Sequence, residues 1–392
     1  MYKTSYLEKI ARKSERFHAK YPKSPLKANC IFWLWNLVQL FRFERSMRPK
    51  SDNVCRIGFL LKGGVGDILV SLNYLQNFHR FFESTLDFDV YIKEKRGLCK
   101  TVQTLCHEQN FVKQVLPSSK LKRDYDLYIE LVRYPNILYF NESKIRSLNL
   151  KLYQWCLTVD KFHSEIPSVY RHGTQGEFIG MRLSALQGHN RLRQADIGNV
   201  IDVESVFQPQ IATNANETLA KFSLENKRFI TIQRGVGGGE RNISTRLWPL
   251  EHYEPLVGLI KERLPDVCIV QVGTEKNLSI KGVDEDLREK TSFEELMVLL
   301  RQASCHIDGE CGLVHLRHFL QGGPSVVMFG PTNENFYGYT DNINMRSDAC
   351  AGGCEWMTST YNEKCPRGFS ENKCLAELLP EEVFKQVIKV VA

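Results

Sequence analysis

The sequence lacks several features that would assign it to a class at once. No apolar run reaches the roughly 18 to 20 residues that a membrane-spanning helix needs. No segment repeats, and no Gly-Lys-Ser/Thr follows the first glycine loop, which excludes a P-loop. Twelve cysteines in 392 residues are too few for a disulfide scaffold.

What is present is an ordinary globular composition with an uneven charge. Hydrophobic residues make up 43 % of the chain and charged residues 25 %, and 392 residues predict two or three domains. Residues 1–52 hold twelve Lys/Arg against four Asp/Glu, a net charge of +8, so the other 340 residues sum to about −1. A nearly neutral body argues against nucleic acid as a partner, because phosphate binding usually spreads Lys and Arg over a folded face.

The pattern of the first 52 residues predicts an N-terminal leader that is not cleaved. Its apolar stretch follows a long charged segment and has no small-residue cleavage pattern behind it, so we expect no signal peptide and a cytoplasmic protein. Residues 30–43, CIFWLWNLVQLFRF, are long enough for three to four helical turns but too short to cross a bilayer. Such aromatic residues suit peripheral contact with the inner membrane. The alternative is packing on the body or on another copy in a homo-oligomer.

Beyond Pro49, strand-like and helix-like segments alternate, which predicts an α/β fold with parallel sheets covered on both faces. We expect two successive Rossmann-like units and a crevice at the carboxyl ends of their strands. The predicted strands span residues 55–61, 88–92, 112–116, 125–131, 229–233, 267–272, 305–308 and 325–329. The predicted helices span 68–82, 98–108, 250–264, 293–303, 313–320 and 380–391. The expected domains are a leader (1–52), an N-terminal Rossmann-like domain (53–205), a linker (206–227), a C-terminal Rossmann-like domain (228–345), a four-cysteine finger (346–376) and a final helix (377–392).

Two glycine-containing segments run from a predicted strand into a predicted helix. In the first, Gly64 and Gly66 allow a tight turn and close approach of a ligand. Asp67 then lies at a helix N-terminus, where the dipole favours its anion and a carboxylate can act as general base; a plain helix cap is the alternative. In the second, Gly312 leaves backbone N–H groups for a phosphate.

Residues around Gly312 and after two further strands complete the candidate site. Glu310 can accept hydrogen bonds from sugar hydroxyls, and His315 either faces the site or simply packs. Gly330 and Thr332 follow the strand 325–329 and are phosphate or ribose candidates, or only a strand-ending turn. Arg234 and Arg246 flank a glycine loop and can hold a diphosphate, because guanidinium suits bidentate phosphate contacts; solvated surface arginines are the alternative.

Four of the cysteines lie together near the C-terminus. Cys350, Cys354, Cys365 and Cys374 fall in a segment rich in Gly, Asn, Ser and Pro, with little core of its own. Four thiols in such a module suit a tetrahedral structural ion, iron or zinc. Free thiols and disulfides are the alternatives, and a reducing cytoplasm disfavours disulfides.

In their order and spacing, four segments resemble the family 9 glycosyltransferases, the ADP-heptose-dependent heptosyltransferases, over about residues 55–391. They are Gly64-Val65-Gly66-Asp67, Arg246-Leu247-Trp248-Pro249, Gly312-Leu313-Val314-His315-Leu316 and Phe329-Gly330-Pro331-Thr332. The resemblance implies a GT-B fold, two Rossmann-like domains facing a central cleft, with acceptor on the N-terminal domain and nucleotide sugar on the C-terminal one. It implies inverting transfer with Asp67 as general base, the Gly312–His315 turn at the donor diphosphate, and no catalytic metal.

The same resemblance guides the expected acceptor. The family's Asp-Thr/Ser pair is Glu310-Cys311 here, and the lysine of its Lys-x-Trp-Pro segment is Arg246, which leaves the donor sugar open. Lipopolysaccharide core is the first expectation. A protein acceptor, an autotransporter adhesin, is the alternative, because family members that glycosylate adhesins carry a similar cysteine finger. A GT-B sugar-nucleotide epimerase or hydrolase and a non-catalytic metal-finger scaffold also stay open.

Overall fold

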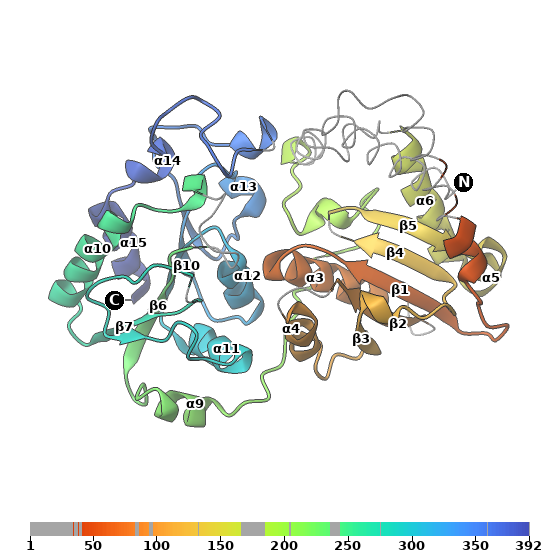
Figure 1. Cartoon of the computed structure of the whole chain (residues 1–392), viewed down its shortest axis with the longest axis horizontal. Coiled ribbons are helices and arrows are strands. Elements are labelled where there is room, and N and C mark those ends of the chain that lie inside the picture. Colours follow the sequence, from red (N-terminus) through yellow and green to blue (C-terminus); the bar gives the residue numbers. More distant parts are fainter. Residues whose placement is uncertain are drawn as a thin grey trace. The chain divides into compact units, whose positions relative to one another are not determined.

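The computed structural model describes Leu34, Val38 and residues 41–391, apart from 83–85, 94–96, 132, 166–184, 204, 236–243, 275 and 359. Most of the aromatic stretch 30–43 and of the glycine loop between Arg234 and Arg246 therefore lies outside the described residues. The chain folds into two compact units, and each unit contains one sheet (Figure 1). The first unit draws on Met1–Gly63, Val70–Leu183 and Leu192–Val206, and the second on Gly64–Leu69, Ser184–Arg191 and Phe207–Ala392.

The first unit holds a five-stranded sheet in the order β3-β2-β1-β4-β5. The first four strands are parallel, and β5 runs antiparallel to β4. On one face of the central strand, Phe59 contacts Phe78 and Phe88 edge-on, with ring centroids 5.6 Å and 5.1 Å away. On the other face, Gly58 leaves room for Tyr128, whose ring a Cβ atom would meet at 2.6 Å. The strands are β1 (Cys55–Leu61), β2 (Leu86–Ile92), β3 (Gln114–Pro117), β4 (Leu127–Leu131) and β5 (Pro135–Phe140). The helices are α3 (Val65–Phe82), whose start through Leu69 belongs to the second unit, α4 (Leu98–Leu105), α5 (Glu142–Leu148) and α6 (Leu150–Glu165).

The second unit holds a six-stranded, fully parallel sheet in the order β11-β10-β9-β6-β7-β8. Alternate residues of its strands face two helical layers: Ile230 packs in the cluster that includes α10 and α15, and Phe229 in the cluster with α11. The strands are β6 (Arg228–Ile232), β7 (Val267–Gln271), β8 (Glu285–Asp286), β9 (His306–Gly309), β10 (Ser325–Met328) and β11 (Ile343–Met345). The helices are α9 (Ala215–Lys221), α10 (Leu250–Arg263), α11 (Phe293–Gln302), α12 (Gly312–Phe319), α13 (Glu334–Tyr337), α14 (Lys373–Ala376) and α15 (Pro380–Val391).

Both sheets have the strand order of a Rossmann fold. In each sheet the chain starts at a central strand, adds the next strands on one side of it, and then crosses to add the remaining strands on the other side. The strand order therefore reverses between β1 and β4 in the first sheet and between β6 and β9 in the second. Ligands of such sheets bind beyond the carboxyl ends of the strands at this reversal. In the second unit those ends lead directly to Arg234 after β6 and to Glu310 after β9.

The prediction of an α/β fold with parallel sheets is confirmed, with one antiparallel strand added. All eight predicted strands are present, and their ends differ from the prediction by at most two residues. The prediction missed the edge strands β5, β8 and β11, because β5 begins with a proline that cannot donate a ladder hydrogen bond and the other two are very short. It also treated α9 as linker. Within the described ranges, no helix is both long and apolar enough to cross a membrane.

Candidate functional site

Asp67 lies in the first turn of α3. The helix begins at Val65, three residues before the predicted start, so Gly66 and Asp67 are helical rather than part of a loop. The Asp67 Oδ2 atom accepts a hydrogen bond from the backbone N–H of Gly64 at 3.2 Å. A helix N-terminus favours negative charge. The local structure therefore fixes the carboxylate at a position that favours negative charge, and the side chain is still 37 % exposed.

Arg191 is the second group that holds Asp67, and the sequence did not predict it. Its Nη2 atom donates to Asp67 Oδ1 at 2.9 Å, while its side chain is only 6 % exposed. The backbone N–H of Arg191 donates to the carbonyl of Phe336 at 2.8 Å, which fixes the arginine in the second unit. No sequence signal separates Arg191 from the neighbouring Arg193, because the contact joins residues 124 positions apart.

Glu310 is the centre of a buried polar group. Its carboxylate forms an ion pair with Arg246, and Thr332 Oγ1 donates to Glu310 Oε2 at 3.3 Å. Burial disfavours charge on Glu310, but Arg246 and His315 outweigh it, so the net pKa of Glu310 is lowered. Asp67 is close enough to act in the opposite direction on the Glu310 pKa. Two carboxylates thus share this part of the second unit.

His315 lies one turn into α12 with both ring nitrogens directed at polar neighbours. Nδ1 is 2.6 Å from the Tyr339 hydroxyl, and Nε2 is 3.8 Å from Glu310 Oε1. Burial raises the pKa of Tyr339, so its hydroxyl keeps its proton. When Tyr339 donates to Nδ1, the Nε2 atom carries the ring proton and points it toward Glu310. His315 packs and also faces the acidic group.

The glycines of the two motifs have different roles. A Cβ atom on Gly66 would lie 2.5 Å from His315 Cδ2, whereas one on Gly64 meets nothing within 4 Å. Gly312 is the first residue of α12, and a Cβ there would lie 3.6 Å from the Gly66 nitrogen. Gly330 belongs to packing, because a Cβ there would meet the Thr245 carbonyl oxygen at 2.7 Å.

The thiol of Cys311 caps α12. Its Sγ accepts from the Leu313 N–H at 3.4 Å and donates to Asp308 Oδ2 at 2.8 Å. Burial, together with the Asp308 carboxylate, raises the pKa of Cys311 well above its ordinary value, so the thiol stays neutral and can donate. Cys311 thus connects the helix start to a completely buried aspartate at the end of β9.

The two predicted arginines have separate partners. Arg246 pairs with Glu310, as described above. Arg234 is 8 % exposed, and its Nε atom donates to the carbonyl of Trp248 at 3.1 Å. The group around Glu310 therefore contains Asp67, Arg246, His315 and Thr332, with Gly66 and Gly312 at its two helix starts. Their roles toward a ligand remain predictions.

The four C-terminal cysteines line one pocket. Cys350, Cys354, Cys365 and Cys374 are all free thiols around it, and burial raises the pKa of Cys374 to about 12. Cys374 Sγ donates to Asn372 Oδ1 at 2.8 Å. Within the described part of the chain, no group of three or more His, Cys, Asp or Glu side chains is placed to hold a metal ion. The donor type fits iron or zinc, but the sulfur atoms would have to close around an ion.

Comparison of the fold with solved structures identifies similar proteins. An Escherichia coli ADP-heptose lps heptosyltransferase II is 16 % identical, with a TM-score of 0.52 over 86 % of this chain and 98 % of its own. A glycosyl transferase of family 9 from Veillonella parvula is 15 % identical, with a TM-score of 0.53 over 88 % and 99 %. The dodecameric iron-containing heptosyltransferase TibC, in complex with ADP-D-β-D-heptose, is 13 % identical, with a TM-score of 0.53 over 88 % and 78 %.

Comparison by sequence identifies no relative. No protein-family model matches the chain, and no curated protein matches it. The structural matches extend over both Rossmann-like units at low identity, which is evidence about the fold. The chain has the GT-B fold, two Rossmann-like units, and shares it with family 9 glycosyltransferases.

Proposed function

We propose that this chain is an inverting glycosyltransferase that moves a heptose from ADP-heptose to an acceptor hydroxyl in the cytoplasm. The observation that carries the proposal is the Asp67 carboxylate, which Arg191 and the Gly64 N–H hold in place at the start of α3. A partly exposed carboxylate held in one orientation is suited to accept a proton from an attacking hydroxyl. The choice of donor is supported by the ADP-D-β-D-heptose bound to a heptosyltransferase of the same fold.

In the proposed reaction, Asp67 takes the acceptor hydroxyl proton while the hydroxyl oxygen attacks the anomeric carbon. The bond from that carbon to the diphosphate oxygen breaks, and ADP leaves with the electron pair. In this proposal the backbone N–H groups at Gly312 and the guanidinium of Arg246 stabilise the charge that grows on the diphosphate. The proposal is supported by Gly312 being the first residue of α12 and by the pairing of Arg246 with Glu310. Glu310, kept ionised by Arg246, accepts hydrogen bonds from the heptose hydroxyls.

A donor-turnover assay tests this proposal. The full chain is incubated with ADP-heptose, and ADP release is followed with and without acceptor. Release that depends on the acceptor, together with heptose incorporation into it, is the expected result. ADP release or sugar isomerisation without any acceptor would indicate a hydrolase or an epimerase. A chain that binds no nucleotide sugar, judged by the absence of a thermal shift, would be a non-catalytic scaffold.

We propose lipopolysaccharide core as the acceptor, with protein as the alternative. The first choice is supported by the fold shared with an lps heptosyltransferase and by the basic, aromatic leader, which suits an acceptor held at a membrane. The protein alternative is supported by the four-cysteine segment. Heptose-free lipopolysaccharide and candidate adhesin proteins, offered to the enzyme in parallel with ADP-heptose, distinguish the two.

We also propose that the four cysteines hold one structural iron or zinc ion. All four thiols line one pocket, and a heptosyltransferase of this fold is described as iron-containing. Elemental analysis of the purified full chain should find about one ion per chain, and a Cys350→Ser/Cys354→Ser variant should lose it. Cys268→Ser, at a half-buried cysteine outside this pocket, should retain the ion. A wild-type protein that contains no metal, and whose stability does not change when iron or zinc is added, would overturn this assignment.

A further inference from the structure

A second pocket lies in the first unit, at the amino ends of its parallel strands. Arg56 is the second residue of β1, Lys113 directly precedes β3, and Tyr125 shortly precedes β4. These positions are at the amino ends of parallel strands. The chain reaches Asp67 only after it leaves the carboxyl end of β1. The pocket is therefore built by a different edge of the sheet from the one that Rossmann-type ligands use.

The size of the pocket restricts what it can hold. Its volume is about 160 Å³. An apolar cavity of about 150 Å³ holds one benzene ring, whereas sites for larger organic ligands occupy roughly 300–1,000 Å³. The pocket therefore has room for one small ring or one charged head group and is too small for a nucleotide.

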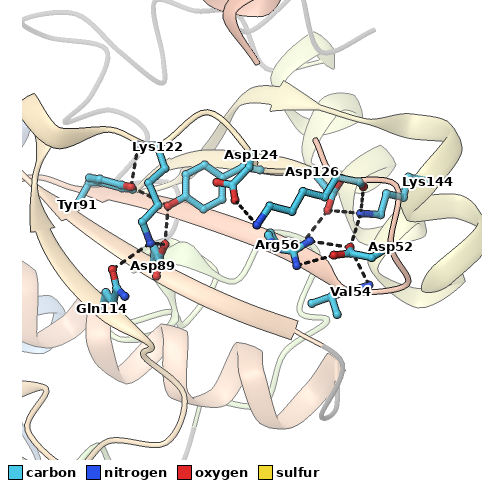
Figure 2. Close-up of polar contacts among 12 residues, drawn as sticks. Asp52, Val54, Arg56, Asp89, Tyr91, Gln114, Lys122, Asp124, Asp126 and Lys144 are labelled. Atoms are coloured by element: carbon cyan, nitrogen blue, oxygen red, sulfur yellow. Dashed lines mark hydrogen bonds and ion pairs between the residues drawn. The ribbon is translucent and has the colours of Figure 1, made fainter. Parts of the chain in front are cut away.

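Asp89 lines this pocket and is itself buried. Its side chain is only 8 % exposed, and its Oδ2 atom accepts from the Tyr125 hydroxyl at 2.7 Å and from Lys122 Nζ at 2.8 Å (Figure 2). Its Oδ1 atom is buried and has no hydrogen-bond partner among the described residues. A buried carboxylate oxygen without a donor is costly. The arrangement calls for a ligand group that donates, such as a hydroxyl.

The remaining lining is mostly cationic. Lys50, Arg56, Lys113 and Lys122 line the pocket with two carboxylates, and Asp52 outside the lining binds Arg56 through two hydrogen bonds of 2.7 Å. Lys122 uses two of its three ammonium hydrogens, on Asp89 and on Gln114 Oε1 (Figure 2).

Lys50 is placed to exchange its partner for a ligand. Its ammonium is 3.4 Å from Asp124, and the lysine side chain is 59 % exposed. Ion pairs this exposed contribute little and exchange readily with other anions. Concave basic surfaces concentrate anions. The lysines therefore supply an anion contact, while Asp89 supplies a hydroxyl contact beside it.

We propose that this pocket binds a single anionic sugar: a ring whose phosphate or carboxylate contacts Lys50, Lys113 and Lys122 and whose hydroxyl donates to Asp89 Oδ1. Such a sugar has two sources, a free sugar phosphate or sugar acid and an anionic residue within a glycan. The site goes beyond the proposed transfer reaction, because none of its residues belongs to the group around Glu310. Its occupancy can be measured without donor or acceptor, so its failure is separate from failure of the proposed function.

Calorimetric titration of the full chain tests this site. Glucose 6-phosphate and glucuronate should bind, inorganic phosphate should bind at least tenfold more weakly, and glucose should not bind. Methyl glucoside 6-phosphate separates the two sources, since its blocked C1 imitates a chain-linked residue. Binding equal to that of glucose 6-phosphate assigns the pocket to a glycan residue, and loss of binding assigns it to the free sugar. No binding of any of these anions would overturn the proposal.

Variants locate the binding. Lys50→Gln/Lys113→Gln changes two exposed residues and should weaken glucose 6-phosphate binding at least tenfold without changing thermal stability. Lys100→Gln/Lys161→Gln removes the same charge from exposed positions outside the pocket and should leave affinity unchanged. Asp89→Asn should reduce affinity for glucose 6-phosphate but not for inorganic phosphate. An equal loss in both lysine pairs would mean general charge attraction and would refute a built site.

Discussion

Gly66 and His315 are in direct contact: a Cβ atom on Gly66 would lie 2.5 Å from the His315 Cδ2 atom. The ring cannot easily move away, because its Nδ1 atom is 2.6 Å from the Tyr339 hydroxyl and the side chain is 9 % exposed. Gly66→Ala should therefore displace His315 or the first turn of α3. We expect a loss of about 1–3 kcal/mol in the free energy of unfolding, measured in urea, as for other overpacked sites.

Gly64→Ala is the matched control for this substitution. A Cβ atom there meets nothing within 4 Å, although Gly64 is only two residues away in the same motif. Its free energy of unfolding should stay within about 0.5 kcal/mol of the wild type, as for most surface changes. If Gly64→Ala and Gly66→Ala destabilise the chain equally, contact with His315 is not the reason for a glycine at position 66.

Removal of the proposed base tests the chemical role of Asp67. Asp67→Asn keeps the shape of the side chain and a hydrogen-bond acceptor for Arg191 but accepts no proton. Transfer should fall by about 10²–10⁴-fold, the usual contribution of general base catalysis, while the affinity for the nucleotide sugar stays nearly the same. Initial rates and titration calorimetry on the same preparation separate the two effects.

The control for that variant is Asp266→Asn, at a side chain that is 64 % exposed in the second unit. It should change neither rate nor affinity. Turnover close to that of the wild type in Asp67→Asn would exclude Asp67 as the base. Loss of donor affinity together with activity would indicate that Asp67 contributes to binding instead.

The sequence was sufficient for most of the strands and for several helices, because their signals are local. The strand 55–61 is mostly apolar, and the helix 293–302 follows a serine cap, where Ser292 Oγ accepts from the Glu295 N–H at 3.1 Å. Contacts such as that between Arg191 and Asp67 join distant segments, so no local pattern announces them. The same limit applies to Gly64 and Gly66. They are equivalent in the sequence motif, but a Cβ atom on Gly66 would meet His315, whereas one on Gly64 would meet nothing within 4 Å.

The ion pair between Glu310 and Arg246 should contribute measurably to stability. The two side chains are only 11 % and 19 % exposed, so Glu310→Gln leaves a largely buried guanidinium without its counter-charge. We expect a loss of about 1–3 kcal/mol in the free energy of unfolding. Glu377→Gln is the control, because its pair with Lys373 is 49 % and 45 % exposed and should cost less than about 0.5 kcal/mol.

The effect of Glu310→Gln should also depend on pH. The pKa of Glu310 is lowered in the folded chain from an ordinary value of 4.5, so its ionised form stabilises the fold. That contribution is fully present above pH 4.5 and is lost as the pH falls through the folded-state pKa. Urea unfolding from neutral to acidic pH should show the difference between wild type and variant shrinking below about 4.5. A difference that grows on acidification would contradict this assignment.

The leader gives the last prediction. Leu34, Val38 and Phe41 are described, with exposed fractions of 64 %, 37 % and 48 %. Their spacings of four and three residues predict that all three share one face of a helix. An apolar face next to a charge of +8 over residues 1–52 is suited to an anionic membrane surface. The full chain should therefore float with anionic liposomes, and a chain without residues 1–50 should not.

A substitution locates this contact more sharply than truncation. Leu34→Gln/Val38→Gln should reduce flotation severalfold, because it removes apolar area from the interface and leaves the charge unchanged. Leu186→Gln/Leu278→Gln changes two leucines that are 75 % and 45 % exposed elsewhere and should float like the wild type. Added salt should weaken binding in every membrane-bound variant, since part of the attraction is electrostatic. If truncation leaves flotation unchanged, the leader does not contact membrane, and its apolar face belongs to a protein contact.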